Sequence, residues 1–151
     1  MPEQVPLFLA PMSGVTDVAY RLLAREAGAD FTSTEFTAAS GLSRQDARSW
    51  AKVETHPSED PFIPQIFGGI EDEMVETARL LSKNADVIDL NFGCPAPKVT
   101  KTCAGAAMMA DPDNLISMVE RCIQASNAPV SYTHLRAHET LRYLVCRLLL
   151  E

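Results

Sequence analysis

The chain of 151 residues is long enough to bury the core of one ordinary domain, and its 46% hydrophobic and 22% charged residues are typical of a globular protein rather than a disordered one. No apolar run reaches the roughly eighteen residues of a membrane-spanning helix, and nothing at the N-terminus resembles a targeting segment, so we expect no association with a membrane. The net charge of −7 argues against a protein that binds nucleic acid over its whole surface, but it leaves room for a local basic patch.

Apolar, strand-like runs alternate with helical stretches along the chain, which is typical of βα units that build a parallel sheet. The predicted elements are a strand at 7–10, a helix at 17–27, a strand at 31–35, a helix at 43–52, a strand at 62–67, a helix at 71–83, a strand at 87–90, a helix at 112–125 and a fifth strand that begins at 128–130. Thr16 or Asp17 can cap the first helix, and Asp111 followed by Pro112 predicts the start of the last one.

A thiol stands directly after the run 85–90, which we interpret as an apolar strand buried on both faces. Gly93 lets the backbone approach a ligand closely, and the prolines that flank Ala96 stiffen the loop beyond Cys94. A free cysteine is commonly a small buried hydrophobe, but this loop sequence favours a functional thiol at Cys94.

We keep the interpretation as a small buried hydrophobe for Cys103, Cys122 and Cys146. The four cysteines form no CxxC pair, so zinc and dithiol redox roles have no support and no metal site is predicted. Unpaired thiols without a signal peptide favour a reducing, cytoplasmic location.

Gln65 places an amide inside an otherwise apolar predicted strand, where burial without a partner would be costly. A planar cofactor with a polar edge would satisfy this amide, and so would a hydrogen bond to a neighbouring loop. The residues alone leave both interpretations open.

All candidate ligand residues fall near the carboxyl ends of predicted strands, where (β/α)8 barrels and doubly wound sheets place their sites. The chain has four complete βα units and the start of a fifth strand, whereas an eight-unit barrel needs about 250 residues and an open sheet rarely ends on an unpaired strand. We therefore expect a truncated chain.

The βα alternation stops near residue 131. The segment 131–151 resembles the translated read-through of a sequencing-library adapter, so we expect a non-native helical tail without a function there. Its leucines and arginines would favour a helix by propensity alone, and a native amphipathic C-terminal helix is the alternative.

Three segments in order, LAPMSGVTD at 9–17, PQIFG at 64–68 and NFGCPAPKVTKTCAGAAMM at 91–109, resemble the tRNA-dihydrouridine synthases. The resemblance covers about residues 5–130. It implies an α/β fold of the (β/α)8 TIM-barrel type that binds FMN, with residues 1–130 as the N-terminal half of the barrel: the first four βα units and the start of the fifth strand.

The resemblance also implies roles for individual residues. Those that match the family's flavin-contacting positions are Pro11, Met12, Ser13, Gln65 and Asn91, of which Asn91 also lies beside the uracil. Cys94 matches the catalytic cysteine, and Lys98 and Lys101 would lie near the RNA backbone.

The implied reaction is reduction of the C5=C6 bond of a uridine in tRNA, in which NADPH or NADH first reduces FMN, hydride passes to C6, and Cys94 protonates C5. The implied partners are tRNA and NAD(P)H, and we infer no obligate protein partner. The target base must leave its stack to reach the flavin.

The chain departs from the family pattern from Ser131 onward, where a lysine and an arginine, the later phosphate-binding loops and a helical RNA-binding domain are missing. One alternative is a flavin-dependent relative of the dihydroorotate or dihydropyrimidine dehydrogenases that acts on a free pyrimidine, although such a pocket has less need of Lys98 and Lys101. Another is that these residues alone form an inactive structural fragment with an open sheet edge.

Overall fold

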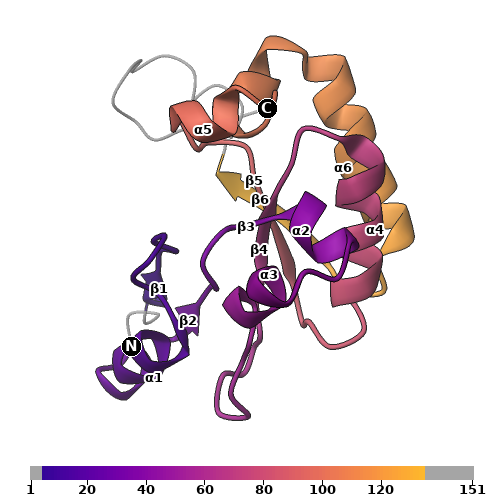
Figure 1. Ribbon diagram of the computed structural model, residues 1–151. Coiled ribbons are helices and arrows are strands. Elements are labelled where there is room, and N and C mark those ends of the chain that lie inside the picture. The colour runs from indigo at the N-terminus through magenta and orange to yellow at the C-terminus, as the bar shows by residue number, and fades with distance from the viewer. Residues whose placement is uncertain (1–4, 135–151) are drawn as a thin grey trace.

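Parallel strand pairing in chain order organises the protein. The computed structural model describes residues 5–134, and their strands form two parallel sheets (Figure 1). The strands are β1 (Phe8–Leu9) and β2 (Phe31–Thr32) in the first sheet, and β3 (Thr37–Ala38), β4 (Gln65–Phe67), β5 (Ile88–Asn91) and β6 (Val130–His134) in the second. Within each sheet, every strand pairs in parallel with the next one along the chain, as consecutive strands of a (β/α)8 barrel do, so the predicted α/β barrel class is confirmed.

The predicted strand at 31–35 is interrupted, because β2 and β3 are separated by residues 33–36. This connection still follows β4: the Thr34 N–H donates to the Ile63 carbonyl over 3.0 Å, and the Ser33 hydroxyl donates to the same oxygen over 3.0 Å. The hydroxyl of Thr34 in turn accepts the N–H of Gln65. Serine and threonine hydroxyls compete in this way with regular ladder bonds, which explains the break.

The longer helices begin where local signals predict them. The helices are α1 (Val18–Glu26), α2 (Ala39–Ser43), α3 (Ala47–Lys52), α4 (Glu71–Leu81), α5 (Pro97–Thr100) and α6 (Pro112–Ala125), with a 3-10 helix η1 (Gly105–Ala110). Asp17 accepts the N–H of Tyr20 at the start of α1, and Asp111 accepts the N–H of Asn114 at the start of α6. Both predicted caps are therefore confirmed.

The single helix predicted at 43–52 is wrong. Two short helices replace it, because Gln45 adopts a left-handed conformation with φ of 59° and Asp46 then caps α3 by accepting the N–H of Ser49. A helix cannot continue through a residue of that handedness. The residues between the predicted strand at 87–90 and the predicted helix at 112–125, for which no element is predicted, contain α5 and η1.

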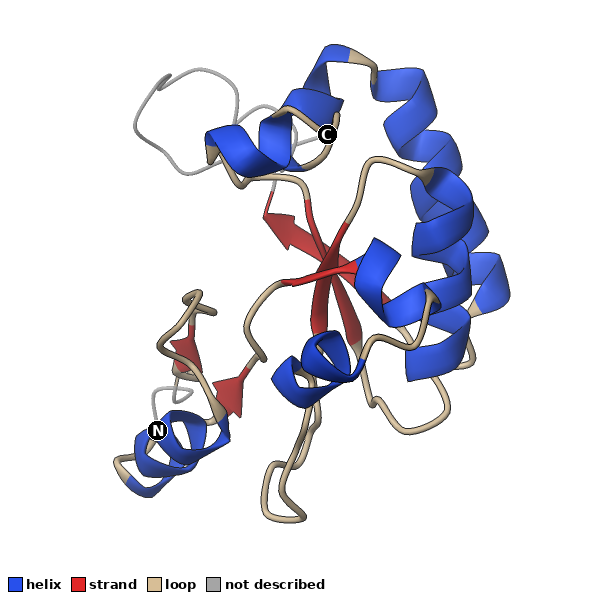
Figure 2. Ribbon diagram, in the orientation of Figure 1, coloured by secondary structure: helices blue, strands red, loops and turns tan. Residues whose placement is uncertain are grey.

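The apolar core lies between the second sheet and helices α2, α4 and α6, which Figure 2 shows on one side of the strands. Ile66, Ile88 and Leu90 supply the strand side of this core. Met74, Ala78, Leu81, Met118 and Cys122 are among the helix residues that pack on them. Side chains alternate across a strand, so the intervening residues point to the opposite face of the sheet.

The predicted tail needs one correction. Strand β6 extends to His134 and pairs in parallel with β5, so residues 131–134 are not helical. Tyr and Thr favour strands, and an edge of β5 is available for pairing. The rest of the predicted tail lies outside the described residues. Within residues 5–134, no helix has the length and apolar character needed to cross a bilayer.

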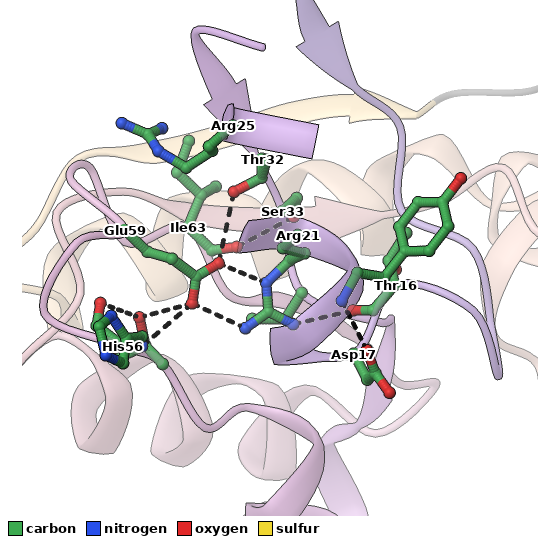
Figure 3. A network of polar contacts seen from close by, with 12 residues as sticks. Thr16, Asp17, Arg21, Arg25, Thr32, Ser33, His56, Glu59 and Ile63 are labelled. Carbon is green, nitrogen blue, oxygen red and sulfur yellow. Dashed lines mark hydrogen bonds and ion pairs between the residues drawn. The ribbon is translucent and has the colours of Figure 1, made fainter. Parts of the chain in front are cut away.

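A buried ion pair between Arg21 of α1 and Glu59 ties the first βα unit to the segment before β4 (Figure 3). The two side chains are 1% and 3% exposed, and the guanidinium Nε and Nη2 donate to the two carboxylate oxygens over 2.6 and 3.0 Å. Arg21 also donates to the carbonyls of Thr16 and Glu54 over 2.8 and 2.7 Å. Such complete pairing is what makes a buried charge tolerable.

Glu59 also accepts from the Thr55 hydroxyl and the His56 N–H, over 3.0 and 3.1 Å. Burial by itself would raise the pKa of Glu59, but the hydrogen bond and the charge of Arg21, with the bonds from His56 and Thr55, hold the pKa below its ordinary value of 4.5. The carboxylate is therefore the stable form in the folded protein.

Replacing Arg21 by Met would leave a buried carboxylate without its cation, so we expect the free energy of unfolding at pH 7 to fall by about 3–5 kcal/mol. In the wild type the pKa of Glu59 is lower in the folded than in the unfolded protein, so its ionisation stabilises the fold at pH values above the unfolded pKa. This stabilisation is lost as the pH falls through the folded pKa. Without Arg21, protonation instead relieves the buried carboxylate. The stability difference between the two proteins should thus shrink as the pH falls below about 4.5, and urea unfolding across pH measures it.

The matched control is Arg44→Met, which removes an ion pair to Glu73 whose arginine side chain is 72% exposed. This substitution should cost less than about 1 kcal/mol. An equal loss of stability in both variants would contradict the role of Arg21 as the cation that compensates the buried Glu59 carboxylate. So would a stability difference between the wild type and Arg21→Met that does not depend on pH.

Candidate functional site

A chain of buried polar side chains runs from Gln65, at the start of β4, to Asn91, at the carboxyl end of β5. Gln65, Asp89 and Asn91 are 0%, 3% and 5% exposed. The Gln65 amide donates from Nε2 to Asp89 Oδ2 over 2.5 Å and accepts at Oε1 from Asn91 Nδ2 over 3.0 Å. The register explains this contact, because Gln65 lies directly opposite Asp89 in the parallel pair and Asn91 follows two residues later on the same face.

Asn91 folds the next loop back over the end of β5. Its Oδ1 accepts the backbone N–H groups of Gly93 and Cys94 over 3.1 and 3.0 Å. Cys94 is partly buried, and its carbonyl accepts the N–H of Ala106 over 3.0 Å. Cys94 is thus held through its N–H by Asn91 at the end of β5, and through its carbonyl by Ala106 of η1.

Gly105 makes this close approach possible. Its φ is 59°, and a Cβ built on it would lie 2.6 Å from the Cys94 carbonyl oxygen and 3.3 Å from Cys94 Cβ. Only a residue without a side chain fits against Cys94 at that position without moving the loop.

The loop after β1 is held by two side chains, Thr16 and Glu35, whose contacts with it were not predicted from the sequence. The Thr16 hydroxyl accepts the N–H of Met12 over 3.0 Å and lies 3.2 Å from the Met12 carbonyl, and Glu35 Oε2 accepts the N–H of Gly14 over 2.6 Å. Arg21 holds the Thr16 carbonyl, so the buried ion pair also supports this loop. Met12 and Ser13 are exposed, and Pro11 is half-buried.

The two candidate RNA-contacting lysines lie on a short helix. Lys98 lies within α5 and Lys101 caps its C-terminus, and both side chains are exposed. Val99 between them is 2% exposed and anchors the helix to the protein. This placement leaves both ammonium groups in contact with solvent.

The structure brings Gln65, Asn91 and Cys94 together. It leaves the loop at 11–13 apart from α5, since Figure 1 shows β1 with its loop at the lower left and α5 near the top. Sequence reasoning missed Asp89, although polar residues two apart in an apolar run, Asp89 and Asn91, are the signal of a strand with one polar face. Strand β5 is buried on both faces, as predicted, but one of these faces is polar.

The other described cysteines differ from each other. Burial, followed by the charge of Glu71, raises the pKa of the Cys122 thiol to about 12, and this thiol packs in the core as predicted. Cys103 is exposed, with a φ of 55°, so its prediction as a buried hydrophobe is wrong. It lies in the tight turn that follows α5. Within residues 5–134, no three His, Cys, Asp or Glu side chains gather as a metal site would need.

These features define the class of the protein: consecutive parallel βα units of a (β/α)8 barrel with a polar site and a thiol at the strand ends. The family model described as dihydrouridine synthase matches residues 8–144, and the chain belongs to this family. A probable tRNA-dihydrouridine synthase of Rhizobium leguminosarum bv. phaseoli is 39% identical over 82% of this chain and 39% of the relative.

Further relatives agree. The tRNA-dihydrouridine synthase B of Xanthomonas axonopodis pv. citri is 35% identical over 83% of this chain and 38% of its own length. A protein of Oryza sativa subsp. japonica, named as tRNA-dihydrouridine(47) synthase, NAD(P)(+)-like, is 32% identical over 83% of this chain and 18% of its own. The chain thus spans about two fifths of the length of the bacterial relatives that it matches.

Replacing Gly105 by Ala should displace the Cys94 loop. The left-handed backbone costs about 1–2 kcal/mol for a residue with a Cβ, and the contact with the Cys94 carbonyl adds about 1–3 kcal/mol of overpacking. Gly14→Ala is the matched control, because its φ is 75° but nothing lies within 4 Å of the added Cβ. Urea unfolding measures both variants, and equal losses would show that Gly105 does not pack against Cys94.

Proposed function

We propose that this chain supplies the proton donor and the flavin-contacting amides for reduction of the C5=C6 bond of a uridine in tRNA to dihydrouridine. The observation that carries the proposal is the Asn91 amide oxygen, which binds the N–H groups of Gly93 and Cys94 and so fixes a thiol at the strand ends of a dihydrouridine synthase family member. The names of the curated relatives support tRNA as the substrate.

The donor set suits FMN. The pyrimidine edge of a flavin carries both hydrogen-bond donors and acceptors, and primary amides offer both functions from one group. Gln65 and Asn91 would hold this edge, and the loop of Pro11, Met12 and Ser13 would hold the ring from the side of β1. FMN, when bound, supplies the hydride that it takes from NADPH or NADH.

The thiol of Cys94 suits the proton transfer that follows hydride transfer. A cysteine thiol is ordinarily protonated at neutral pH, whereas an ordinary carboxyl group is ionised and has no proton to give. After hydride has reached C6, the S–H bond breaks as a C–H bond forms at C5, and the thiolate left behind regains a proton from solvent. The hydrogen bonds that position Cys94 use its backbone N–H and carbonyl, so none of these bonds involves the sulfur.

The positive charges of Lys98 and Lys101 suit the phosphate groups of the tRNA backbone. Two exposed ammonium groups on the helix that follows the Cys94 loop can neutralise phosphates next to the extruded uridine. This local patch reconciles an acidic chain with an RNA substrate, because phosphate contact needs charge only where the strand passes.

The role of Cys94 can be tested in a hybrid in which residues 5–130 replace the matched segment of the Rhizobium relative, assayed with FMN, NADPH and an unmodified tRNA transcript. We expect dihydrouridine to form, and Cys94→Ala to lower the rate by about 10²–10⁴-fold, the usual worth of a general acid. Cys103→Ala, which removes an exposed thiol of the same loop, should keep the rate. Mass spectrometry of digested tRNA measures the product.

A Cys94→Ala rate within a few-fold of the parent would contradict the proton-donor role. Turnover of free uracil or orotate, with none on tRNA, would instead favour an enzyme for free pyrimidines. The 151-residue chain assayed alongside, for FMN binding as well as turnover, tests whether these residues act alone.

The lysines predict a salt effect. Lys98→Ala and Lys101→Ala in the same hybrid should each weaken tRNA binding and reduce the slope of log K against log salt by about one unit or less. Lys52→Ala is the control, because Lys52 is exposed at the end of α3. An unchanged slope for both α5 variants, measured by filter binding at several salt concentrations, would remove these lysines from the RNA contact.

A further inference from the structure

We propose that Asp89 is a positioning residue, which fixes the direction of the hydrogen bonds through Gln65 and Asn91 and thereby holds the Cys94 loop against the end of β5. The functional meaning of this role rests on the proposed function, in which Cys94 delivers a proton. The hydrogen-bond pattern itself rests only on the contacts of β4, β5 and the loop.

The two ends of this polar chain have fixed polarity. At one end Asp89, as a carboxylate, can only accept, and its Oδ2 faces the Gln65 amide. At the other end the backbone N–H groups of Gly93 and Cys94 can only donate, and both face Asn91.

The two amides between these ends can each be turned either way, but one arrangement alone satisfies both ends. Gln65 must present Nε2 to Asp89, which leaves Oε1 toward Asn91. Asn91 must then present Nδ2 to Gln65, which leaves Oδ1 for the two loop N–H groups. If Asn91 were turned, its NH2 group would face two N–H donors and the loop would lose its attachment.

Burial makes the preference for this one orientation of the amides energetically strong. The three residues are between 0% and 5% exposed. A buried donor without an acceptor destabilises the protein by more than a typical hydrogen bond stabilises it. A bond to a charged acceptor is also stronger than one between neutral groups. Asp89 thus acts on the thiol through two amides, and no contact between its carboxylate and the reacting base is needed.

The test is Asp89→Asn in the complete 151-residue chain, followed by amide hydrogen exchange in NMR. A neutral amide at position 89 can face Gln65 with either end, so only the two loop N–H groups still favour one direction, and the bond to Gln65 loses its charged acceptor. We expect exchange at the Gly93 and Cys94 N–H groups to speed up by about fivefold or more, the effect of weakening a charge-assisted bond in a buried place. The N–H of Tyr20, which Asp17 holds at the start of α1, should exchange as before.

A charge-swapped variant distinguishes direction from packing. In Gln65→Glu with Asp89→Asn, the new carboxylate can accept from both asparagines, so Asn91 again presents its oxygen to the loop and slow exchange at Gly93 and Cys94 should return. A swap that exchanges as fast as Asp89→Asn, or a folded Asp89→Asn that protects both amides fully, would overturn the proposal.

The wild-type chain provides a measurement that no failure of a variant to fold can remove. Scalar coupling across the hydrogen bond should connect the Gly93 and Cys94 amide nitrogens to the side-chain carbonyl carbon of Asn91, and its absence in the folded protein would overturn the proposal. None of these measurements uses FMN, NADPH or tRNA. A failure of the proposed reaction would therefore leave them unaffected, and their failure would not affect the reaction.

Discussion

The register of β4 against β5 is the constraint on which the site depends. Gln65 lies opposite Asp89, and Ile66 lies opposite Leu90, so one face of the pair is polar and the other apolar. The apolar face joins the core beneath α4 and α6, and the polar face carries the hydrogen bonds that reach Cys94. One backbone alignment therefore determines both the packing of the helices and the position of the thiol.

A second constraint supports the other side of the site. Arg21 and Glu59 are 38 residues apart in sequence and form a fully paired, buried contact that also holds the carbonyl of Thr16. Thr16 in turn holds both backbone groups of Met12. The position of the loop after β1 thus depends on an ion pair whose acidic member lies on the segment before β4.

Local signals made part of this structure predictable. Asp111 with Pro112 marks the start of α6, and the Gly and Pro residues around Cys94 mark an irregular loop after a strand, because caps and turn residues act on their own neighbours. The break between α2 and α3 was missed because Gln45 adopts a left-handed conformation that its residue type does not announce. The same reasoning found Gln65 and Asn91 but not their contact, which depends on strand register.

Asp89 and the Arg21–Glu59 pair show why the remainder could not be read locally. A single aspartate in an apolar run resembles an exposed residue until its partner across the sheet is known, and that partner lies 24 residues away. An arginine on a helix likewise resembles a surface residue. Buried polar groups are identified by their partners, and these come from distant parts of the chain.

The alternation along β5 makes correct folding and site formation a single event. If β5 paired with β4 one residue out of register, Asp89 and Asn91 would enter the apolar layer under the helices, and Ile88 and Leu90 would face the place where the amides now meet. Such a chain would lose its core and its thiol anchor together. Selection for a stable protein therefore also maintains the strand alignment that the proposed chemistry requires.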